Sequence, residues 1–247
     1  MRMKNLMAGA LRKGALVLCL MFIHNPQLMA KNADVQNIVL VHGAFTDGSC
    51  WSAVISLLQA QGYHATAVQN PLTSLRDDVA ATERILERQN GNVLLVGHSW
   101  AGAVITQAGN ATNVKGLVYL SALVPDSNQS VSDALAHFNA PMTAMEADKN
   151  GLIWLDKPEL FHQVMANDMS LKQSQLLAAV QQPIAAAAFK EKVNAAAWRE
   201  KPSWYLLTEN DNALNPSVQA DFAREAGARI TRIHSGHLSM ISHPEDV

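Results

Sequence analysis

Three residues that lie far apart in the chain, Ser99, Asp211 and His237, are of the types that together make a serine hydroxyl reactive. A hydroxyl is a weak nucleophile until a neighbouring base takes its proton. An imidazole can be that base, and a carboxylate behind it fixes its tautomer and stabilises the imidazolium. The chemistry predicted for such a set is acyl transfer through a covalent intermediate on the serine.

Ser99 stands in the stretch Gly97-His-Ser-Trp-Ala-Gly102, between an apolar run and a helix-like sequence. A buried strand that leads directly into a helix leaves a tight turn, which exposes the residue at its apex and needs small residues on either side. Gly97 and Ala101 occupy the small positions, and the alanine departs from the usual G-x-S-x-G pattern. We predict that Ser99 is the nucleophile.

The base is expected late in the chain, because the order in such a site is serine, acid, histidine. His237 follows the last predicted strand, on a loop that can reach the serine. His234 belongs to the end of that strand, His243 suits a surface position, and His162 is less plausible. His237 is therefore the predicted base.

The acid is expected on the loop after the preceding strand. Asp211 has the spacing that such a loop requires. Two alternatives stay open, namely Glu209 on the same loop and Asp126 after an earlier strand. Each of these carboxylates could instead cap a helix or turn. Asp211 is the predicted acid.

Acyl transfer also needs N–H donors for the oxygen that becomes negative in the reaction. One is the N–H of Trp100, the residue after the nucleophile. The other is expected on the loop His42-Gly-Ala-Phe45 after the first strand, where the N–H of Ala44 is the best candidate. Gly43 lets this loop pass close to the serine. His42 is predicted to pack beneath the loop as a structural residue.

The elements that must position these residues alternate along the chain. Helical patterns separate continuous apolar runs, which is typical of a parallel sheet covered on both faces. The fold predicted is α/β, doubly wound, with a mostly parallel sheet. The strands are expected at residues 38–41, 64–68, 93–96, 114–120, 204–207 and 229–233.

A long interruption at residues 126–201 separates two parts of the predicted core, 31–125 and 202–247. It shows no convincing strand, and its alanine runs favour helix. We predict a helical cap, inserted before the last two strands, over the carboxyl edge of the sheet, where open α/β folds bind ligands. The side chains expected to bind substrate are Phe45, Leu123, Trp154 and Phe161. Such a lining favours an apolar or aromatic substrate of modest size.

The N-terminus has the pattern of a secretory signal peptide at residues 1–30, with basic residues, a short apolar run and cleavage expected near Ala30. An uncleaved membrane tether or a disordered tail is the alternative. We predict a secreted, periplasmic protein with no stable membrane anchor after processing. Cys50 would then be the single cysteine, so that no internal disulfide forms.

The 247 residues are 49% hydrophobic and 16% charged, which suits one sizeable globular domain. The formal charge of −2 gives no electrostatic footprint for nucleic-acid binding. His234 and His237 form the single close histidine pair, and no nearby carboxylate completes a metal-ligand set. The partner predicted is a small-molecule ester, and the oligomeric state stays open.

Five motifs in order resemble the α/β-hydrolase superfamily, above all its small branch of plant methyl-ester esterases, hydroxynitrile lyases and bacterial esterase-like proteins. They are Val39-Leu-Val-His-Gly-Ala44, Gly97-His-Ser-Trp-Ala-Gly102, Leu120-Ser-Ala-Leu-Val-Pro-Asp126, Thr208-Glu-Asn-Asp211 and Ser235-Gly-His237. The resemblance implies six parallel strands, a helical cap, no cofactor and the roles given above. Leu238 stands where the lyases have a lysine, which disfavours cyanohydrin cleavage.

The function predicted is a serine hydrolase that cleaves a small carboxylic ester through an acyl-enzyme intermediate. A lactonase, amidase or acyltransferase could use the same three residues. A protein of another class, which binds a ligand and keeps the hydrolase fold, is the further alternative. The natural ester stays open.

Overall fold

The computed structural model describes residues 35–141 and 145–247. The predicted signal peptide at residues 1–30 lies outside the described residues. Within the described ranges, no helix is long and apolar enough to cross a membrane.

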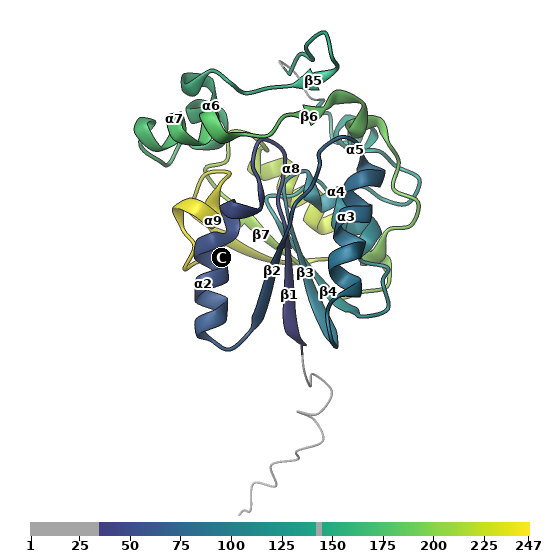
Figure 1. Ribbon diagram of the computed structural model, residues 1–247. Helices are drawn as coiled ribbons and strands as arrows, with labels where there is room; N and C mark the ends of the chain where they lie inside the picture. The colour runs from purple at the N-terminus through teal and green to yellow at the C-terminus, as the bar shows by residue number, and fades with distance from the viewer. Residues whose placement is uncertain (1–34, 142–144) are drawn as a thin grey trace, which may run out of the picture. The chain divides into compact units, whose positions relative to one another are not determined.

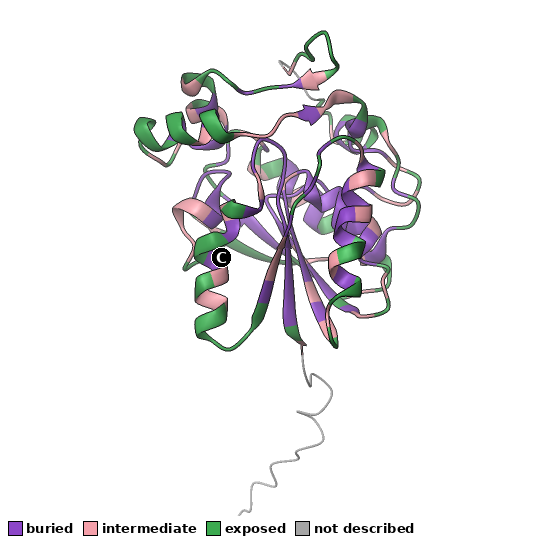
Figure 2. Ribbon diagram, in the orientation of Figure 1, coloured by how far each residue is buried: buried purple, intermediate pink, exposed green. Residues whose placement is uncertain are grey.

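Six parallel strands form the central sheet in the order β2-β1-β3-β4-β7-β8, which confirms the predicted α/β fold (Figure 1). Their inner members are almost wholly apolar and buried, as expected of a sheet covered on both faces (Figure 2). The strands are β1 (Val35–Val41), β2 (His64–Val68), β3 (Asn92–His98), β4 (Val114–Leu120), β7 (Ser203–Thr208) and β8 (Arg229–Ile233).

The strand order places β1 directly beside β3, with β2 on the outside. The chain leaves β1 toward one edge of the sheet and leaves β3 toward the other, so the loops after these two strands diverge. Such a switch point is where open α/β sheets bind ligands. The loop of Ala44 follows β1 and the turn of Ser99 follows β3, and Val41 pairs with Gly97 in the register. The topology therefore brings these two loops together.

Helices cover the sheet, with α2 and α9 on one face and α3 and α4 on the other (Figure 1). Ser74 caps α3, because its side chain accepts from the N–H of Asp77. The core helices are α2 (Ser52–Ala60), α3 (Leu75–Glu87), α4 (Ala101–Ala108), α8 (Pro216–Glu225) and α9 (Ser239–Ser242), with a 3-10 turn η2 (Gly48–Trp51) before α2.

Residues 126–201 lie between β4 and β7, and their helices α6 and α7 lie above the carboxyl ends of the strands (Figure 1). The helices and 3-10 turns of this cap are α5 (Val131–His137), α6 (Pro158–Met165), α7 (Leu171–Val180), η3 (Ala186–Lys190) and η4 (Ala197–Arg199).

The expectation of no strand in the cap is wrong, because β5 (Leu152–Ile153) and β6 (Ile184–Ala185) form a short antiparallel pair. The alanine run that favours helix begins at β6. There the N–H of Ala185 donates to the Leu72 carbonyl at 2.9 Å, and that of Ala186 to the Gly151 carbonyl at 2.9 Å. Because tertiary partners take these N–H groups, the run forms a strand and a 3-10 turn, and helix propensity is overridden.

Candidate active site

Ser99 sits at the apex of the turn between β3 and α4 with φ of 54°, in the left-handed region. Residues other than glycine are seldom held there, and when they are, it is commonly at functional sites. The Ser99 N–H donates to the Leu120 carbonyl at 3.0 Å, and its carbonyl accepts from the N–H groups of Gly102 and Leu123 at 2.9 and 3.0 Å. These bonds hold the strained turn from three sides.

The small residues around Ser99 are required by crowding. A Cβ on Gly97 would lie 2.7 Å from the Ala101 carbonyl oxygen, and one on Gly102 would collide with the carbonyl oxygen of Leu123. The strand, the helix and the loop after β4 thus approach one another too closely for larger side chains. This accounts for the small-residue pattern read from the sequence.

The three predicted triad residues meet. His237 Nε2 lies 2.9 Å from Ser99 Oγ, and His237 Nδ1 lies 2.7 Å from Asp211 Oδ2. The imidazole and the carboxylate are buried, with 1% and 5% of each residue exposed, whereas Ser99 is half-buried. With the Nδ1 proton donated to the carboxylate, Nε2 is free to accept the serine proton. The geometry is that of an activated serine.

Asp211 is held by four further donors. Its Oδ2 also accepts from Thr208 Oγ1 at 2.8 Å and from Gln219 Nε2 at 3.0 Å, and its Oδ1 accepts from the N–H groups of Ala213 and Leu214, both at 2.8 Å. These bonds hold the buried carboxylate in place and aim it at the imidazole. Gln219 lies on α8, and no sequence pattern marks it as part of the site.

The alternative acids and bases lie elsewhere. Asp126 forms an ion pair with Arg199, and that pair lowers the pKa of the Asp126 carboxyl. Glu209 lies 3.7 Å from His234 on the exposed side of the loop. His243 lies beside Asp168, 3.4 Å away. The structure thus brings only the predicted three together among the residues that it describes.

Two buried histidines support the site without facing the substrate. Nδ1 of His42 donates to the Gly43 carbonyl at 2.8 Å, and its Nε2 accepts from the N–H of Asn70 at 2.9 Å, so it is the structural residue predicted. Nε2 of His98 donates to the backbone carbonyl of His237 at 3.0 Å. Burial lowers the pKa of both rings, which keeps them neutral. This role of His98 is not predicted from the sequence, because His98 occupies the first variable position of the G-x-S-x-G pattern.

Ala44 and Trp100 line the same cavity as Ser99. Among the described residues, neither backbone N–H donates to another backbone or side-chain atom. Trp100 precedes the first residue of α4, so the positive end of the helix dipole points at the site. Both N–H groups are thus suitable donors for an oxyanion beside Ser99.

Asp78, a residue that the sequence reasoning missed, anchors the Trp100 side chain. Its Oδ2 accepts from Trp100 Nε1 at 2.7 Å, and its Oδ1 accepts from the N–H of Leu72 at 2.8 Å. Burial raises the pKa of this carboxyl to about 6, against the lowering effect of these two hydrogen bonds. The anchored indole packs edge-on against Phe189, with ring centroids 5.0 Å apart.

The cavity at Ser99 has a volume of about 370 Å³ and a mostly apolar lining. Of the four residues predicted to bind substrate, Phe45 and Leu123 line it. Trp154 and Phe161 do not: Trp154 is 42% exposed and donates to Asp148 at 3.3 Å, and Phe161 is fully buried within the protein.

The side chains of α6 that line the cavity are Leu160, Val164 and Met165. Leu160 and Val164 are four residues apart and so share one face of the helix. Phe161 is buried and is four residues from Met165, yet only Met165 of these two reaches the cavity. An amphipathic cap helix has apolar residues toward both its own core and the cavity, and the sequence does not distinguish the two directions.

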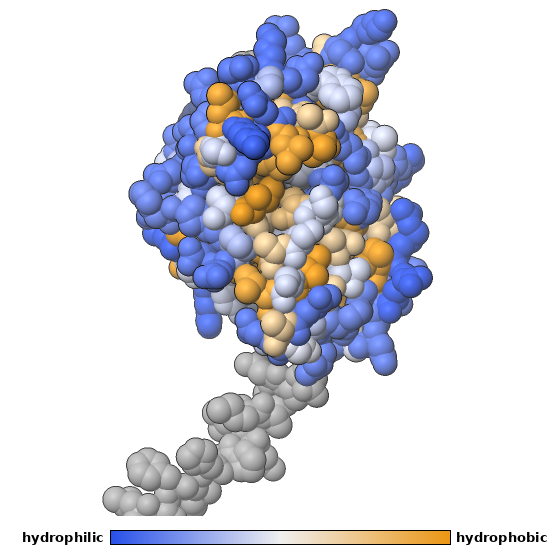
Figure 3. Space-filling model, turned by 60° about the vertical axis from the view of Figure 1, so that its left-hand side comes forward, coloured by the Kyte–Doolittle hydropathy of each residue, from blue (hydrophilic) through white to orange (hydrophobic). Residues whose placement is uncertain are grey.

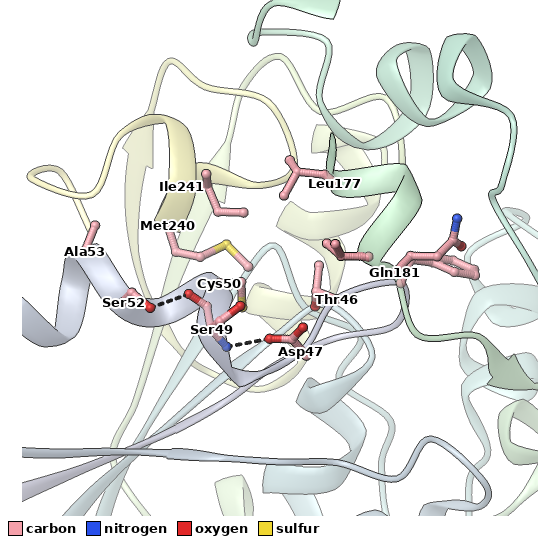
Figure 4. Close-up of a pocket in the computed structure, with 12 residues that line it drawn as sticks. Thr46, Asp47, Ser49, Cys50, Ser52, Ala53, Leu177, Gln181, Met240 and Ile241 are labelled. Atoms are coloured by element: carbon pink, nitrogen blue, oxygen red, sulfur yellow. Dashed lines mark hydrogen bonds between the residues drawn. The ribbon is translucent and has the colours of Figure 1, made fainter. Parts of the chain in front are cut away.

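A second cavity, of about 250 Å³, lies between the loop after β1, α7 and α9 (Figure 4). None of the triad residues lines it, but Phe45 lines both cavities. Its apolar walls include Leu177 and Val180 of α7 and Ile241 of α9. Figure 3 shows apolar side chains gathered among polar ones on one face of the molecule.

Residues 38–247 match the α/β hydrolase family. The match covers most of the chain, so the chain belongs to this family, as its motifs predict, and it is a hydrolase with esterase-like relatives. It is 26% identical to the carbendazim hydrolyzing esterase of Nocardioides over 85% of this chain and 96% of that protein. It is 30% identical to methylesterase 3 of Arabidopsis thaliana over 42% of this chain and 46% of that protein.

Among solved structures, polyneuridine aldehyde esterase superposes with a TM-score of 0.72. The superposition covers 85% of this chain and 95% of that one, at 20% sequence identity. At this identity the likeness shows the fold, and the chemistry has to be argued from the site.

Proposed function

We propose that this protein is a serine esterase that cleaves a small carboxylic ester through an acyl-enzyme intermediate. The observation that carries the proposal is the continuous hydrogen-bonded chain from Ser99 Oγ through His237 to Asp211, at 2.9 and 2.7 Å. It starts at a half-exposed hydroxyl in an apolar cavity and ends at a fully bonded, buried carboxylate.

In the first half of the reaction, Ser99 Oγ attacks the ester carbonyl carbon while His237 Nε2 takes its proton. The carbonyl oxygen becomes negative and accepts from the N–H groups of Ala44 and Trp100. The intermediate then collapses, the bond to the alcohol oxygen breaks, and the imidazolium returns its proton to the departing alcohol. An acyl group is left on Ser99.

In the second half, a water molecule attacks the acyl carbon and His237 Nε2 takes a proton from it. The second tetrahedral intermediate again places its negative oxygen at the same two N–H groups. Its collapse breaks the bond to Ser99 Oγ, which regains its proton from the imidazolium. The products are the carboxylic acid and free enzyme.

The lining of the cavity supports an ester with an apolar group of modest size. Leu123, Leu160 and Val164 offer apolar surface, and the volume of about 370 Å³ falls at the lower end of the range of ligand pockets. The names of the relatives, a methylesterase and a carbendazim hydrolyzing esterase, agree with hydrolysis of small esters.

The test combines a fluorophosphonate probe with a panel of p-nitrophenyl esters. Wild type is expected to gain one adduct and to turn over short apolar esters, and Ser99→Ala is expected to lose both. Asp211→Asn keeps its shape but favours the wrong tautomer of His237, so kcat is expected to fall by roughly 10³- to 10⁴-fold. Asp126→Asn is the matched control, since it removes the alternative acid, and it is expected to keep the wild-type kcat. Hydrolysis by a clean preparation of Ser99→Ala would contradict the proposal.

We also propose that residues 1–30 direct export and are cleaved near Ala30. The basic residues and short apolar run of that segment support this. The measurement is the intact mass of protein recovered from the periplasmic and membrane fractions of a bacterial host. A mass that keeps residues 1–30 in the membrane fraction favours the tether.

A further inference from the structure

The end of α6 and the turn after it contact the loops of two of the three predicted triad residues, Asp211 and His237. Asn167 Nδ2 donates to the carbonyl of Asn210 at 2.8 Å, and Asn212 Nδ2 donates to the carbonyl of Gln163 at 2.9 Å. Asn210 and Asn212 are the two neighbours of Asp211 in the chain. The acid loop is therefore bonded to the cap on both sides of the acid.

The loop of the base is bonded to the same turn by one carboxylate. Asp168 Oδ2 accepts from the N–H of Gly236 at 2.7 Å and from Ser242 Oγ at 2.8 Å. Gly236 directly precedes His237, and Ser242 ends the short helix α9 that follows it. The side chain of Asp168 is 15% exposed, and of its two bonds the one to Gly236 is partly buried while the one to Ser242 lies at the surface. One carboxylate thus bridges the two ends of the segment that carries the base.

The fit around Gly236 is tight. A Cβ at this position would lie 2.6 Å from Asn167 Oδ1 and 2.7 Å from Asp168 Oδ1. The cap turn therefore packs directly against the backbone before His237, and a Cβ at Gly236 would displace the side chains of Asn167 and Asp168. Loops are usually the more mobile parts of a fold, yet reacting groups have to be held to within about 0.5 Å. Strand β8 ends at Ile233, so the segment beyond it is held by bonds from other parts of the chain, among them His98 on the His237 carbonyl and Asp168 on the Gly236 N–H.

We infer that Asp168 is a positioning residue for the proposed esterase: through Gly236 and Ser242 it fixes the segment that aims His237 at Ser99. The inference rests on the proposed function, because it assigns Asp168 a part in the same reaction. It makes the cap part of the catalytic apparatus, in addition to its part in lining the substrate cavity.

The test compares Asp168→Ala with a control that loosens the cap equally but does not contact the catalytic loops. Asp148 is that control, since its carboxylate accepts from the N–H groups of Asn150 and Leu152 within the cap. For p-nitrophenyl acetate, Asp168→Ala is expected to lower kcat by about 10- to 100-fold with KM within about threefold, as a small displacement of a reacting group does. Asp148→Ala is expected to keep kcat within about threefold of wild type.

Asp168→Asn is expected to recover most of the lost kcat, because an amide oxygen can accept from both donors. Ser242→Ala removes one donor, leaves the bond to Gly236 and is expected to give an intermediate loss; it carries the test if Asp168→Ala does not fold. Wild-type kcat in a folded Asp168→Ala, or an equal loss in Asp148→Ala, overturns the inference.

Hydrogen exchange of the Gly236 amide gives a readout that needs no activity. The amide is expected to be protected in wild type and in Asp148→Ala, and to exchange faster in Asp168→Ala. If the Gly236 amide exchanges at the wild-type rate in Asp168→Ala, the hydrogen bond between Asp168 and Gly236 does not restrain this segment, and the inference is refuted. A wild type that no fluorophosphonate labels refutes the proposed function and with it the catalytic part of the inference, whatever the exchange shows.

Discussion

Replacing Gly43 by alanine should damage the oxyanion loop more than it damages the fold. The new Cβ would lie 2.8 Å from the Ser99 Cβ and 3.0 Å from the His98 carbonyl oxygen, whereas ordinary contacts begin at 3.4 Å. The loop that carries Ala44 and the serine must therefore move apart, and reaching an ordinary contact takes ~0.6 Å, which is the difference between 3.4 and 2.8 Å. Overpacking of this kind costs about 1–3 kcal/mol of stability. A misplacement of about 1 Å can cost about 100-fold, so a donor displaced by ~0.6 Å is expected to cost about 10-fold in kcat.

The assay measures kcat, the pH profile of kcat/KM and thermal unfolding for Gly43→Ala and for Gly109→Ala. Gly109 ends α4 at the side away from Ser99, and a Cβ there would lie 2.6 Å from the Ile105 carbonyl oxygen, so the crowding is comparable. Both variants should lose stability, but only Gly43→Ala should lose kcat per folded molecule. Its pH profile should keep the wild-type midpoint, because the bond between His237 and Asp211 is not touched. Equal kcat in the two variants would refute the reasoning.

Two further predictions concern Asp78 and Phe45. The Asp78 carboxyl holds its proton up to about pH 6 in the fold but only up to 3.8 when unfolded, so the native state binds more protons between these values and stability falls as pH rises. The free energy of unfolding of wild type, measured by denaturant titration relative to that of Asp78→Asn, should therefore decrease by up to about 3 kcal/mol from pH 4 to pH 8. A difference between the two proteins that does not change with pH would contradict this. Phe45 lines both cavities, so Phe45→Ala should lower stability by about 3–5 kcal/mol and raise the kcat/KM ratio of p-nitrophenyl octanoate to acetate. An unchanged ratio would show that Phe45 does not separate the two spaces.

The triad could be predicted from the sequence because each member follows a recognisable apolar strand. Ser99 follows β3, Asp211 follows β7 and His237 follows β8. In a parallel sheet the carboxyl ends of all strands meet at one edge. Three local patterns therefore suffice to bring together residues that are 138 positions apart at most. The tight packing around Ser99 requires small residues, and these can be recognised in the sequence.

The supporting bonds could not be predicted because they join segments that no local pattern relates. Asp78 lies in the first turn of α3, where an acidic residue would be expected on helix grounds alone, yet it binds Trp100, 22 positions away. Asp168 binds Gly236 across 68 positions. The same limit explains why Trp154 and Phe161 were wrongly expected to line the cavity. Their apolar character can be read from the sequence, but the direction in which their side chains point cannot.

The hydrogen bonds of the cap bear on which part of the fold positions the predicted catalytic groups. If the sheet alone positioned the catalytic groups, the cap could change freely to fit new substrates. Here the acid loop is bonded to Gln163 of α6 and to Asn167 of the turn after it, and the base loop is held through Asp168 of that turn. Helix α6 also forms part of the wall of the cavity, at Met165. A change that shifts α6 to admit a larger ester therefore also shifts the donors and acceptors behind the triad. We therefore expect selectivity and rate to be coupled through α6 and the turn that follows it.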